Sequence, residues 1–123
     1  MRDNIRSKVA VIIPCYKAKN KLGILCNSIL DIASKLSQFC SISIYIVDDF
    51  CPEKSYLEVP TSEMIKVINN KKNMGVGFSS LIGFKEALNS GNQLFIKMDS
   101  DGQHPAEYLL ELIPYLLKLS DYE

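Results

Sequence analysis

Short runs of apolar residues alternate along this chain with longer segments in which apolar residues recur every three or four positions. Residues 9–13 are continuously apolar, as is typical of a strand buried on both faces, and the largely apolar segments 42–47, 64–68 and 94–98 predict three further strands. The periodic segments predict amphipathic helices over residues 20–37, over residues 78–89 and from Pro105 onward. Pro114 should kink or restart the last helix. Two polar segments, 50–62 and 69–77, predict a loop and a glycine-bearing turn.

This order of elements predicts an α/β protein with a single domain over residues 1–123. We expect a Rossmann-like, open and mostly parallel sheet with helices on both faces. Right-handed crossovers favour the strand order 3-2-1-4. The carboxyl ends of the first, second and fourth strands would then line one crevice, which Pro14, Asp49 and Asp99 would border. Ligands of open α/β sheets bind in such a crevice.

The balance of charge argues against several kinds of partner. Lys and Arg number 14, as do Asp and Glu, so no basic field indicates nucleic acid or an anionic membrane surface. The apolar runs are too short for the core of a secretory leader or for the ~20 residues of a membrane span. We therefore expect a cytoplasmic protein, without a membrane span in this chain.

The cysteines predict no metal centre of their own. None of the four forms a C-x-x-C pair, and the single histidine, His104, is not spaced for a zinc site. We expect reduced, structural thiols. A reactive Cys15 or Cys51, both beside the predicted crevice, is the alternative.

The most informative motif is the pair of carboxylates, Asp99 and Asp101, that follows the fourth apolar run. Alternate residues of an extended segment point the same way, so the two carboxylates can converge on one cation. Oxygen ligands suit Mg²⁺ or Mn²⁺, and such ions often link carboxylates to substrate phosphates. A turn or a helix cap is the alternative role for these residues.

Two other metal motifs can be compared with this segment. An EF-hand loop that began at Asp99 would need Gly and Glu where His104 and Leu110 stand, so that interpretation fails. A phosphatase of the haloacid dehalogenase type also has a strand that ends in D-x-D-G. Its motif normally lies on the first strand, with Thr where Gln103 stands. It remains a minor alternative.

Two further segments contribute candidate ligands. Asp48 and Asp49 close the second strand, where a carboxylate could accept a hydrogen bond from a uracil or guanine N–H or from a ribose hydroxyl. The alternative is a turn that opens the following loop, and Asp49 is the better candidate for binding. Residues 73–77 precede a helix and could bring backbone close to a ligand, or form a plain helix entry.

Together, these segments resemble the family 2 glycosyltransferases, which have the nucleotide-sugar-binding fold called GT-A. The matching segments are VIIPCY at 11–16, YIVDD at 45–49, NMGVG at 73–77 with Gly83, and MDSDGQHP at 98–105. The last is similar in particular to the dolichyl-phosphate mannosyltransferase-like branch. Lys17 stands where the family usually has Asn, and Phe50-Cys51 stand where it usually has Gly-Ser.

The resemblance implies a role for each matching residue. Pro14 and Tyr16 would border the nucleotide, and Val47 and Asp49 would hold the base and the ribose. At the diphosphate, the implied ligands of Mg²⁺ or Mn²⁺ are Asp99, Asp101 and Gln103, while Ser100 would add a backbone contact.

The same resemblance implies the donor-binding half of a glycosyltransferase. The donor would be a UDP- or GDP-sugar, and the acceptor a lipid phosphate or a polysaccharide. Family members continue for about as many residues again, and no catalytic base can be assigned in this chain. The alternative is therefore a truncated fragment that binds nucleotide without turnover. Completion by a partner chain and self-association through uncovered apolar surface are further expectations.

Overall fold

The sheet has four parallel strands in the order β3-β2-β1-β4, as the sequence predicts. The computed structural model describes residues 7–101 and 106–120. The strands are β1 (Ser7–Cys15), β2 (Cys40–Asp48), β3 (Ile65–Asn69) and β4 (Leu94–Lys97). β1 lies between β2 and β4 and is buried from Val9 to Cys15, which explains its continuous apolar run.

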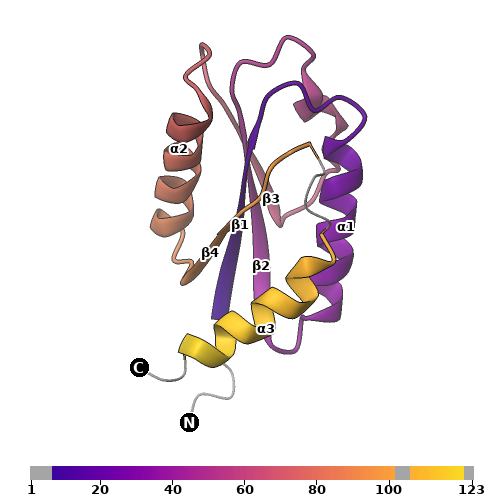
Figure 1. The fold of residues 1–123 in the computed structure, drawn as a ribbon, viewed down its shortest axis with the longest axis vertical. Helices are drawn as coiled ribbons and strands as arrows, with labels where there is room; N and C mark the ends of the chain where they lie inside the picture. Colours follow the sequence, from indigo (N-terminus) through magenta and orange to yellow (C-terminus); the bar gives the residue numbers. More distant parts are fainter. Residues whose placement is uncertain (1–6, 102–105, 121–123) are drawn as a thin grey trace.

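Helices cover both faces of the sheet (Figure 1). They are α1 (Leu22–Lys35), α2 (Val76–Asn89) and α3 (Tyr108–Ser120). α1 and α3 lie on one face, over the larger apolar core, and α2 lies alone on the other face. The predicted Rossmann-like, open α/β architecture is therefore confirmed.

The close approach of α2 to the sheet depends on Gly83. A Cβ atom at this position would lie 2.6 Å from Ile12 Cγ2 and 3.2 Å from Val47 Cγ2. The first distance is shorter than real contacts allow and the second is tight, so a larger residue would force Ile12 or the helix to shift. Gly83 thereby sets the distance between this face of the sheet and the helix that begins beside its carboxyl edge.

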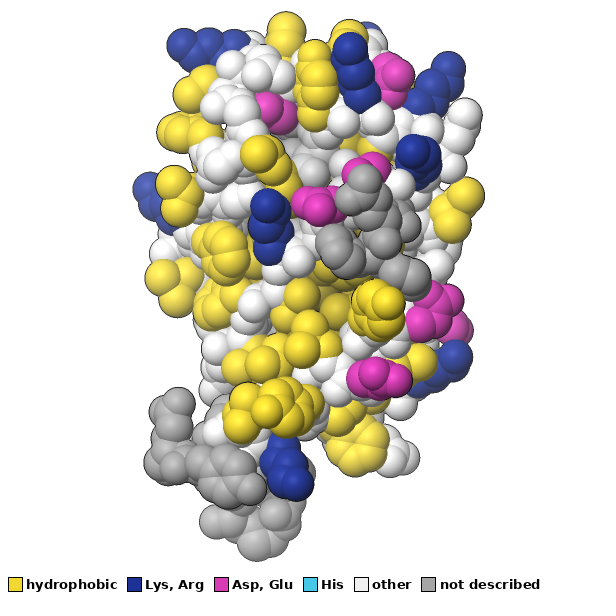
Figure 2. Space-filling view, in the orientation of Figure 1, with side chains coloured by type: hydrophobic (Ala, Val, Ile, Leu, Met, Phe, Trp, Pro, Cys, Tyr) yellow, Lys and Arg dark blue, Asp and Glu magenta, His cyan; other side chains and the backbone are white. Residues whose placement is uncertain are grey.

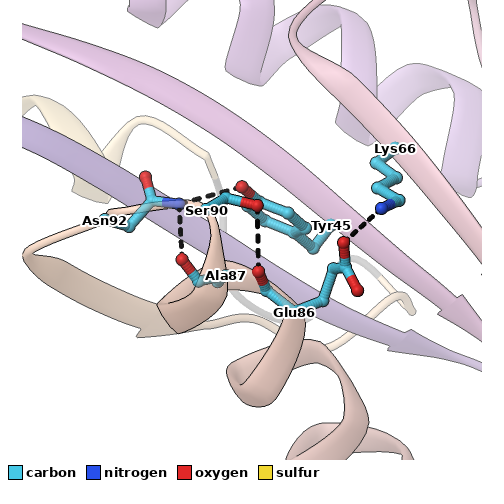
Figure 3. Close-up of polar contacts among 6 residues, drawn as sticks. All are labelled: Tyr45, Lys66, Glu86, Ala87, Ser90 and Asn92. Carbon is cyan, nitrogen blue, oxygen red and sulfur yellow. Dashed lines mark hydrogen bonds and ion pairs between the residues drawn. The ribbon is translucent and has the colours of Figure 1, made fainter.

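Polar contacts hold the C-terminal end of α2 against the sheet (Figure 3). The Asn92 amide donates to the Tyr45 hydroxyl at 2.8 Å and to the Ala87 carbonyl at 2.9 Å. On the surface nearby, Lys66 of β3 pairs with Glu86 of α2. The Asn92 contact ties the turn between α2 and β4 to the second strand, and the Lys66–Glu86 pair ties the last turn of α2 to the third strand.

The structure differs from the sequence-based expectation in two elements. The predicted loop at 50–62 contains one turn of 3₁₀-helix, η1 (Ser55–Glu58). The last helix does not restart at Pro114, because α3 continues through it. Its predicted start at Pro105 lies outside the described residues.

Apolar side chains gather on the surface over α3 (Figure 2). The exposed large apolar residues of this helix are Tyr108, Leu112, Tyr115 and Leu119. Self-association through such surface stays a prediction. Among the helices of the described residues, none has both the length and the apolar character needed to span a membrane.

Candidate functional site

The carboxyl ends of the strands meet at one edge of the sheet, as parallel pairing requires. Cys15 of β1 is in register with Asp48 of β2, and the Asp49 N–H donates to the Cys15 carbonyl at 2.9 Å. On the other side of β1, the Met98 N–H donates to the Ile12 carbonyl at 2.9 Å. The residues that follow β1, β2 and β4 are therefore brought to the same edge.

Two cavities adjoin at this edge, and both are lined by Tyr16 and Asn73. The smaller one, of about 320 Å³, is also lined by Pro14, Cys15, Asp49, Gly75 and Val76. The larger one, of about 520 Å³, is lined in addition by Asp48, Phe50, Cys51, Pro52, Lys54, Tyr56, Asn69 and Asn70. Tyr16 thus stands between two hollows, of which the larger has aromatic and acidic walls.

Asp48 contributes a buried carboxylate to the larger cavity. The residue is only 3% exposed, and its Oδ2 accepts the Cys51 N–H at 3.2 Å. Its Oδ1 finds no hydrogen-bond partner in residues 7–101 and 106–120. Burial raises the pKa of Asp48; the Cys51 N–H opposes that shift, and the adjacent Asp49 charge adds to it. Oδ2 therefore holds the turn at Cys51, whereas Oδ1 is a buried acceptor without a hydrogen-bond partner among the described residues.

Asp49 holds the segment that leads into α2. Its Oδ1 accepts the Met74 N–H at 2.6 Å and the Asn70 amide at 3.0 Å, and its Oδ2 accepts the Gly75 N–H at 2.8 Å. Burial alone would raise the pKa of Asp49, but these hydrogen bonds and one from Ser79 outweigh it and lower the pKa. Both oxygens are therefore engaged by protein groups, although the residue does line the smaller cavity.

The loop after β1 is bound to the loop after β2 through a row of four backbone amides, which we call the amide row. The N–H groups of residues 17–20 donate to side chains of the segment 51–58. The bonds run from Lys17 to Cys51 Sγ (3.0 Å), Ala18 to Ser55 Oγ (3.0 Å), Lys19 to Glu53 Oε1 (3.3 Å) and Asn20 to Glu58 Oε2 (2.7 Å).

The amide row accompanies unusual backbone conformations in both loops. The non-glycine residues with positive φ are Lys17 (59°), Asn20 (67°), Phe50 (57°) and Lys54 (51°). Such conformations cost free energy in L-residues and persist where surrounding contacts impose them. The hydrogen bonds of the amide row are such contacts, and they link the two loops that contribute walls to the larger cavity.

The predicted metal ligands follow β4, but their local geometry differs from the expected one. The strand ends at Lys97, and Ser100 and Asp101 already belong to a turn, so the alternation of an extended segment does not apply to them. The Asp99 side chain is 44% exposed, and its Oδ1 lies 4.0 Å from Lys97 Nζ. Asp101 is exposed. Gln103 lies outside the described residues.

The donor set still suits a hard cation, because two carboxylates offer only oxygen ligands. Within residues 7–101 and 106–120, no three His, Cys, Asp or Glu side chains gather to hold a metal ion. Asp99 and Asp101 would thus need further oxygens from a ligand or from water. Ser100, which is buried, connects this turn to the smaller cavity because its side chain hydrogen-bonds Cys15.

The predicted site residues fall into three groups. Pro14, Tyr16 and Asp49 line the cavities, whereas Asp99, Ser100 and Asp101 lie at the end of β4 and line neither of these two hollows. Val47 is fully buried beside Gly83, so its side chain is part of the core. Sequence reasoning missed Phe50, Tyr56 and Asn70 as cavity residues. The only sequence signal for their place in the cavity wall is the polar and aromatic character of their loops.

Comparisons with known proteins agree with this architecture. The chain is 35% identical over 117 residues to dolichol-phosphate mannosyltransferase of Pyrococcus furiosus, which covers 93% of this chain and 31% of that protein. It is 27% identical over 112 residues to polyprenol monophosphomannose synthase of Mycolicibacterium smegmatis, covering 86% of this chain and 40% of that protein. The chain thus spans between about a third and two fifths of the length of these relatives.

A solved structure and a family profile complete the comparison. The crystal structure of S. aureus TarS 1-349 superposes with a TM-score of 0.64 at 21% identity, covering 90% of this chain and 32% of that one, and supports the fold alone. The profile of glycosyl transferase family 2 matches residues 10–121. Because that match covers nearly the whole chain, the protein belongs to glycosyl transferase family 2.

Proposed function

We propose that this chain is the donor-binding part of a glycosyltransferase that takes a UDP- or GDP-sugar together with Mg²⁺ or Mn²⁺. One observation carries the proposal: Asp48 lines a cavity at the carboxyl edge of the sheet, and its buried carboxylate keeps one oxygen without a hydrogen-bond partner among the described residues. Membership in family 2 supports a sugar donor as the ligand and leaves the phosphatase alternative without support.

The larger cavity suits a nucleobase. A flat ring would fit between aromatic walls such as Tyr16 and Phe50, where stacking on an aromatic side chain is favourable. The spare Asp48 oxygen would accept an N–H of the base, since a buried acceptor without a partner costs free energy until a ligand satisfies it. Uracil and guanine carry a ring N–H that can donate, whereas the corresponding ring nitrogens of cytosine and adenine are acceptors.

The other end of the donor would reach the turn after β4. Asp99 and Asp101 would hold the divalent ion, with Gln103 as the third ligand that the family resemblance implies. When bound, such an ion offsets the negative charge that develops on the departing diphosphate. Lys97, 4.0 Å from Asp99, places a second positive charge at this turn. Tyr16, which borders both cavities, would lie along the nucleotide between its two ends.

The acceptor would be a lipid phosphate or a polysaccharide. The names of the relatives favour the lipid: dolichol-phosphate mannosyltransferase, polyprenol monophosphomannose synthase and, at 29% identity, an undecaprenyl-phosphate 4-deoxy-4-formamido-L-arabinose transferase of Photorhabdus laumondii. Mannose is accordingly the first sugar to test. Because the relatives are much longer than this chain, we assign no acceptor site and no catalytic base to the described residues.

Calorimetry with four nucleotides tests the proposal. In the presence of Mn²⁺, UDP or GDP should bind at least tenfold more tightly than CDP and ADP. Asp48→Asn should reduce that preference, because an amide can donate to cytosine or adenine as well as accept. Asp31→Asn, which neutralises an exposed carboxylate on α1, is the matched control and should change nothing. Equal affinity for all four nucleotides in the native protein would refute the assignment.

Turnover distinguishes a complete enzyme from a binding fragment. We expect no transfer of mannose from GDP-mannose to a polyprenyl phosphate by this chain alone, and transfer once a polypeptide that completes the domain is added. Transfer by the isolated chain would contradict this expectation and assign the whole activity to these 123 residues.

A further inference from the structure

Cys51 occupies an unusual position for a thiol, because it is both a wall of the larger cavity and a partner in the amide row. Its Sγ accepts the Lys17 N–H at 3.0 Å and lies 3.6 Å from the Ser55 hydroxyl oxygen. The residue is 5% exposed and lines the larger cavity. A small molecule that entered the cavity would therefore lie beside Cys51.

The groups around the sulfur favour its thiolate form. Burial alone would raise the pKa of Cys51, but hydrogen bonds from the Ser55 backbone and hydroxyl and from the backbone of Lys17 and Glu53 outweigh it and lower the pKa. The other thiols contrast with it: burial raises the pKa of Cys15 to about 12 and of Cys26 to about 11. Cys40 is buried under α1, where its thiol hydrogen-bonds the Leu36 carbonyl.

A second feature independently marks this cavity as a place for a ligand. Asp48, which is only 3% exposed, lines the same cavity as Cys51, and its Oδ1 has no hydrogen-bond partner among the described residues. A buried acceptor without a partner among the described residues is costly unless something that enters the cavity satisfies it. Cys51 thus lines the cavity that such a ligand would occupy.

We propose that Cys51 is a modification site whose thiolate reacts with disulfides and other soft electrophiles that enter the larger cavity, and that the adduct blocks nucleotide binding. In the reaction with a disulfide, the Cys51 sulfur forms a new S–S bond, the S–S bond of the reagent breaks, and its second sulfur leaves as a thiolate. Cys51 is oxidised to a mixed disulfide and the reagent is reduced. An added thiol reverses the step.

The adduct acts in two ways. The added atoms fill part of the cavity, and a disulfide sulfur is a weaker acceptor for the Lys17 N–H than the free Cys51 sulfur. The amide row then loses its first bond, the one from Lys17. Tyr16 immediately precedes Lys17, so the loop that positions Tyr16 is no longer held at that point. The loss of nucleotide binding rests on the proposed function, whereas the selective reaction of Cys51 does not.

Labelling with methyl methanethiosulfonate at pH 7, followed by peptide mass spectrometry, tests the site. Cys51 should be modified at least tenfold faster than Cys15, Cys26 or Cys40 in the folded protein, and urea should abolish this difference. Cys51→Ser, in which the hydroxyl can still accept the Lys17 N–H, should remove the fast reaction; circular dichroism checks its fold. Faster labelling of any other cysteine, or no labelling of Cys51 before unfolding, would overturn the proposal.

Calorimetry then tests the consequence. Treatment should weaken Mn²⁺-dependent binding of UDP or GDP by the native protein at least tenfold, dithiothreitol should restore it, and the affinity of Cys51→Ser should be the same before and after treatment. Unchanged binding by fully labelled native protein would overturn the coupling. If the untreated protein binds neither nucleotide, the proposed function fails, and the selectivity of labelling alone decides the modification site.

Discussion

The carboxylate of Asp49, the residue after the second strand, accepts the Gly75 N–H at 2.8 Å and so holds the residue immediately before α2. The same carboxylate binds the Met74 N–H. A negative charge at the amino end of a helix is also favoured by the helix dipole. One acidic side chain thereby fixes the position of a helix that packs on the opposite side of the sheet from α1, and shapes the smaller cavity.

Removal of this carboxylate should destabilise the fold. Asp49→Ala leaves the Met74 and Gly75 N–H groups without their acceptor, and we expect the free energy of unfolding to fall by about 1–3 kcal/mol. Urea denaturation followed by circular dichroism measures it. Asp31→Ala, which breaks an exposed pair with Lys35 on α1, is the control and should cost no more than about 0.5 kcal/mol. An equal effect of the two substitutions would show that Asp49 does not hold α2.

The contribution of Asp49 should depend on pH in a defined direction. Its pKa is lowered in the folded state, so the stability it contributes is present above the unfolded value of about 3.9 and is lost as pH falls through the lower, folded value. The difference in unfolding free energy between native protein and Asp49→Asn should therefore shrink below about pH 4. A difference that stays constant down to pH 2 would contradict the charged hydrogen bonds described above.

Asp48 should show the opposite dependence. Burial raises its pKa, so the stability linked to this group is present below the unfolded value of about 3.9 and is lost as pH rises through the higher, folded value. Asp48→Asn should consequently unfold at higher urea concentration than the native protein at pH 7, and this gain should disappear near pH 3. A loss of stability at pH 7 would mean that the charge of Asp48 is paired within the protein.

Two glycines of α2 provide a matched test of packing. Gly83→Ala would place a methyl group 2.6 Å from Ile12 Cγ2, so we expect a loss of about 1–3 kcal/mol in the free energy of unfolding. Gly77→Ala meets nothing within 4 Å and should stabilise the same helix by up to about 1 kcal/mol. Thermal unfolding of both variants measures the contrast. Similar midpoints would mean that α2 does not lie as close to β1 as described.

Much of the fold follows from the sequence, because each strand is marked by its own apolar run. The run at 9–13 identifies β1 as the strand buried on both faces, and right-handed crossovers then give the order of the other three. The 3₁₀ turn η1 carries no such signal. Its position depends on contacts between distant segments, such as the bond from the Ala18 N–H to the Ser55 hydroxyl.

The different roles of Asp48 and Asp49 could not be predicted from the sequence. Adjacent carboxylates look equivalent in the chain, and Asp49 is the one that the family resemblance favours for the ligand. In the structure, both oxygens of Asp49 are bound by residues 70–75, whereas Asp48 keeps one oxygen without a partner among the described residues. Whether Asp48 or Asp49 binds other parts of the protein depends on the position of residues 70–75, more than twenty residues away. The local sequence around the two carboxylates does not predict that position. The ribose contact proposed for Asp49 stays a prediction.

Titration of the native protein and of Asp101→Ala with UDP and GDP, with Mn²⁺ and then with excess chelator, tests the central claim most directly. The account predicts that at least one nucleotide binds the native protein, that chelator weakens this binding at least tenfold, and that Asp101→Ala binds with the same weak affinity in both conditions. Equal binding by the native protein with and without chelator would contradict a donor site that depends on a metal held by Asp99 and Asp101.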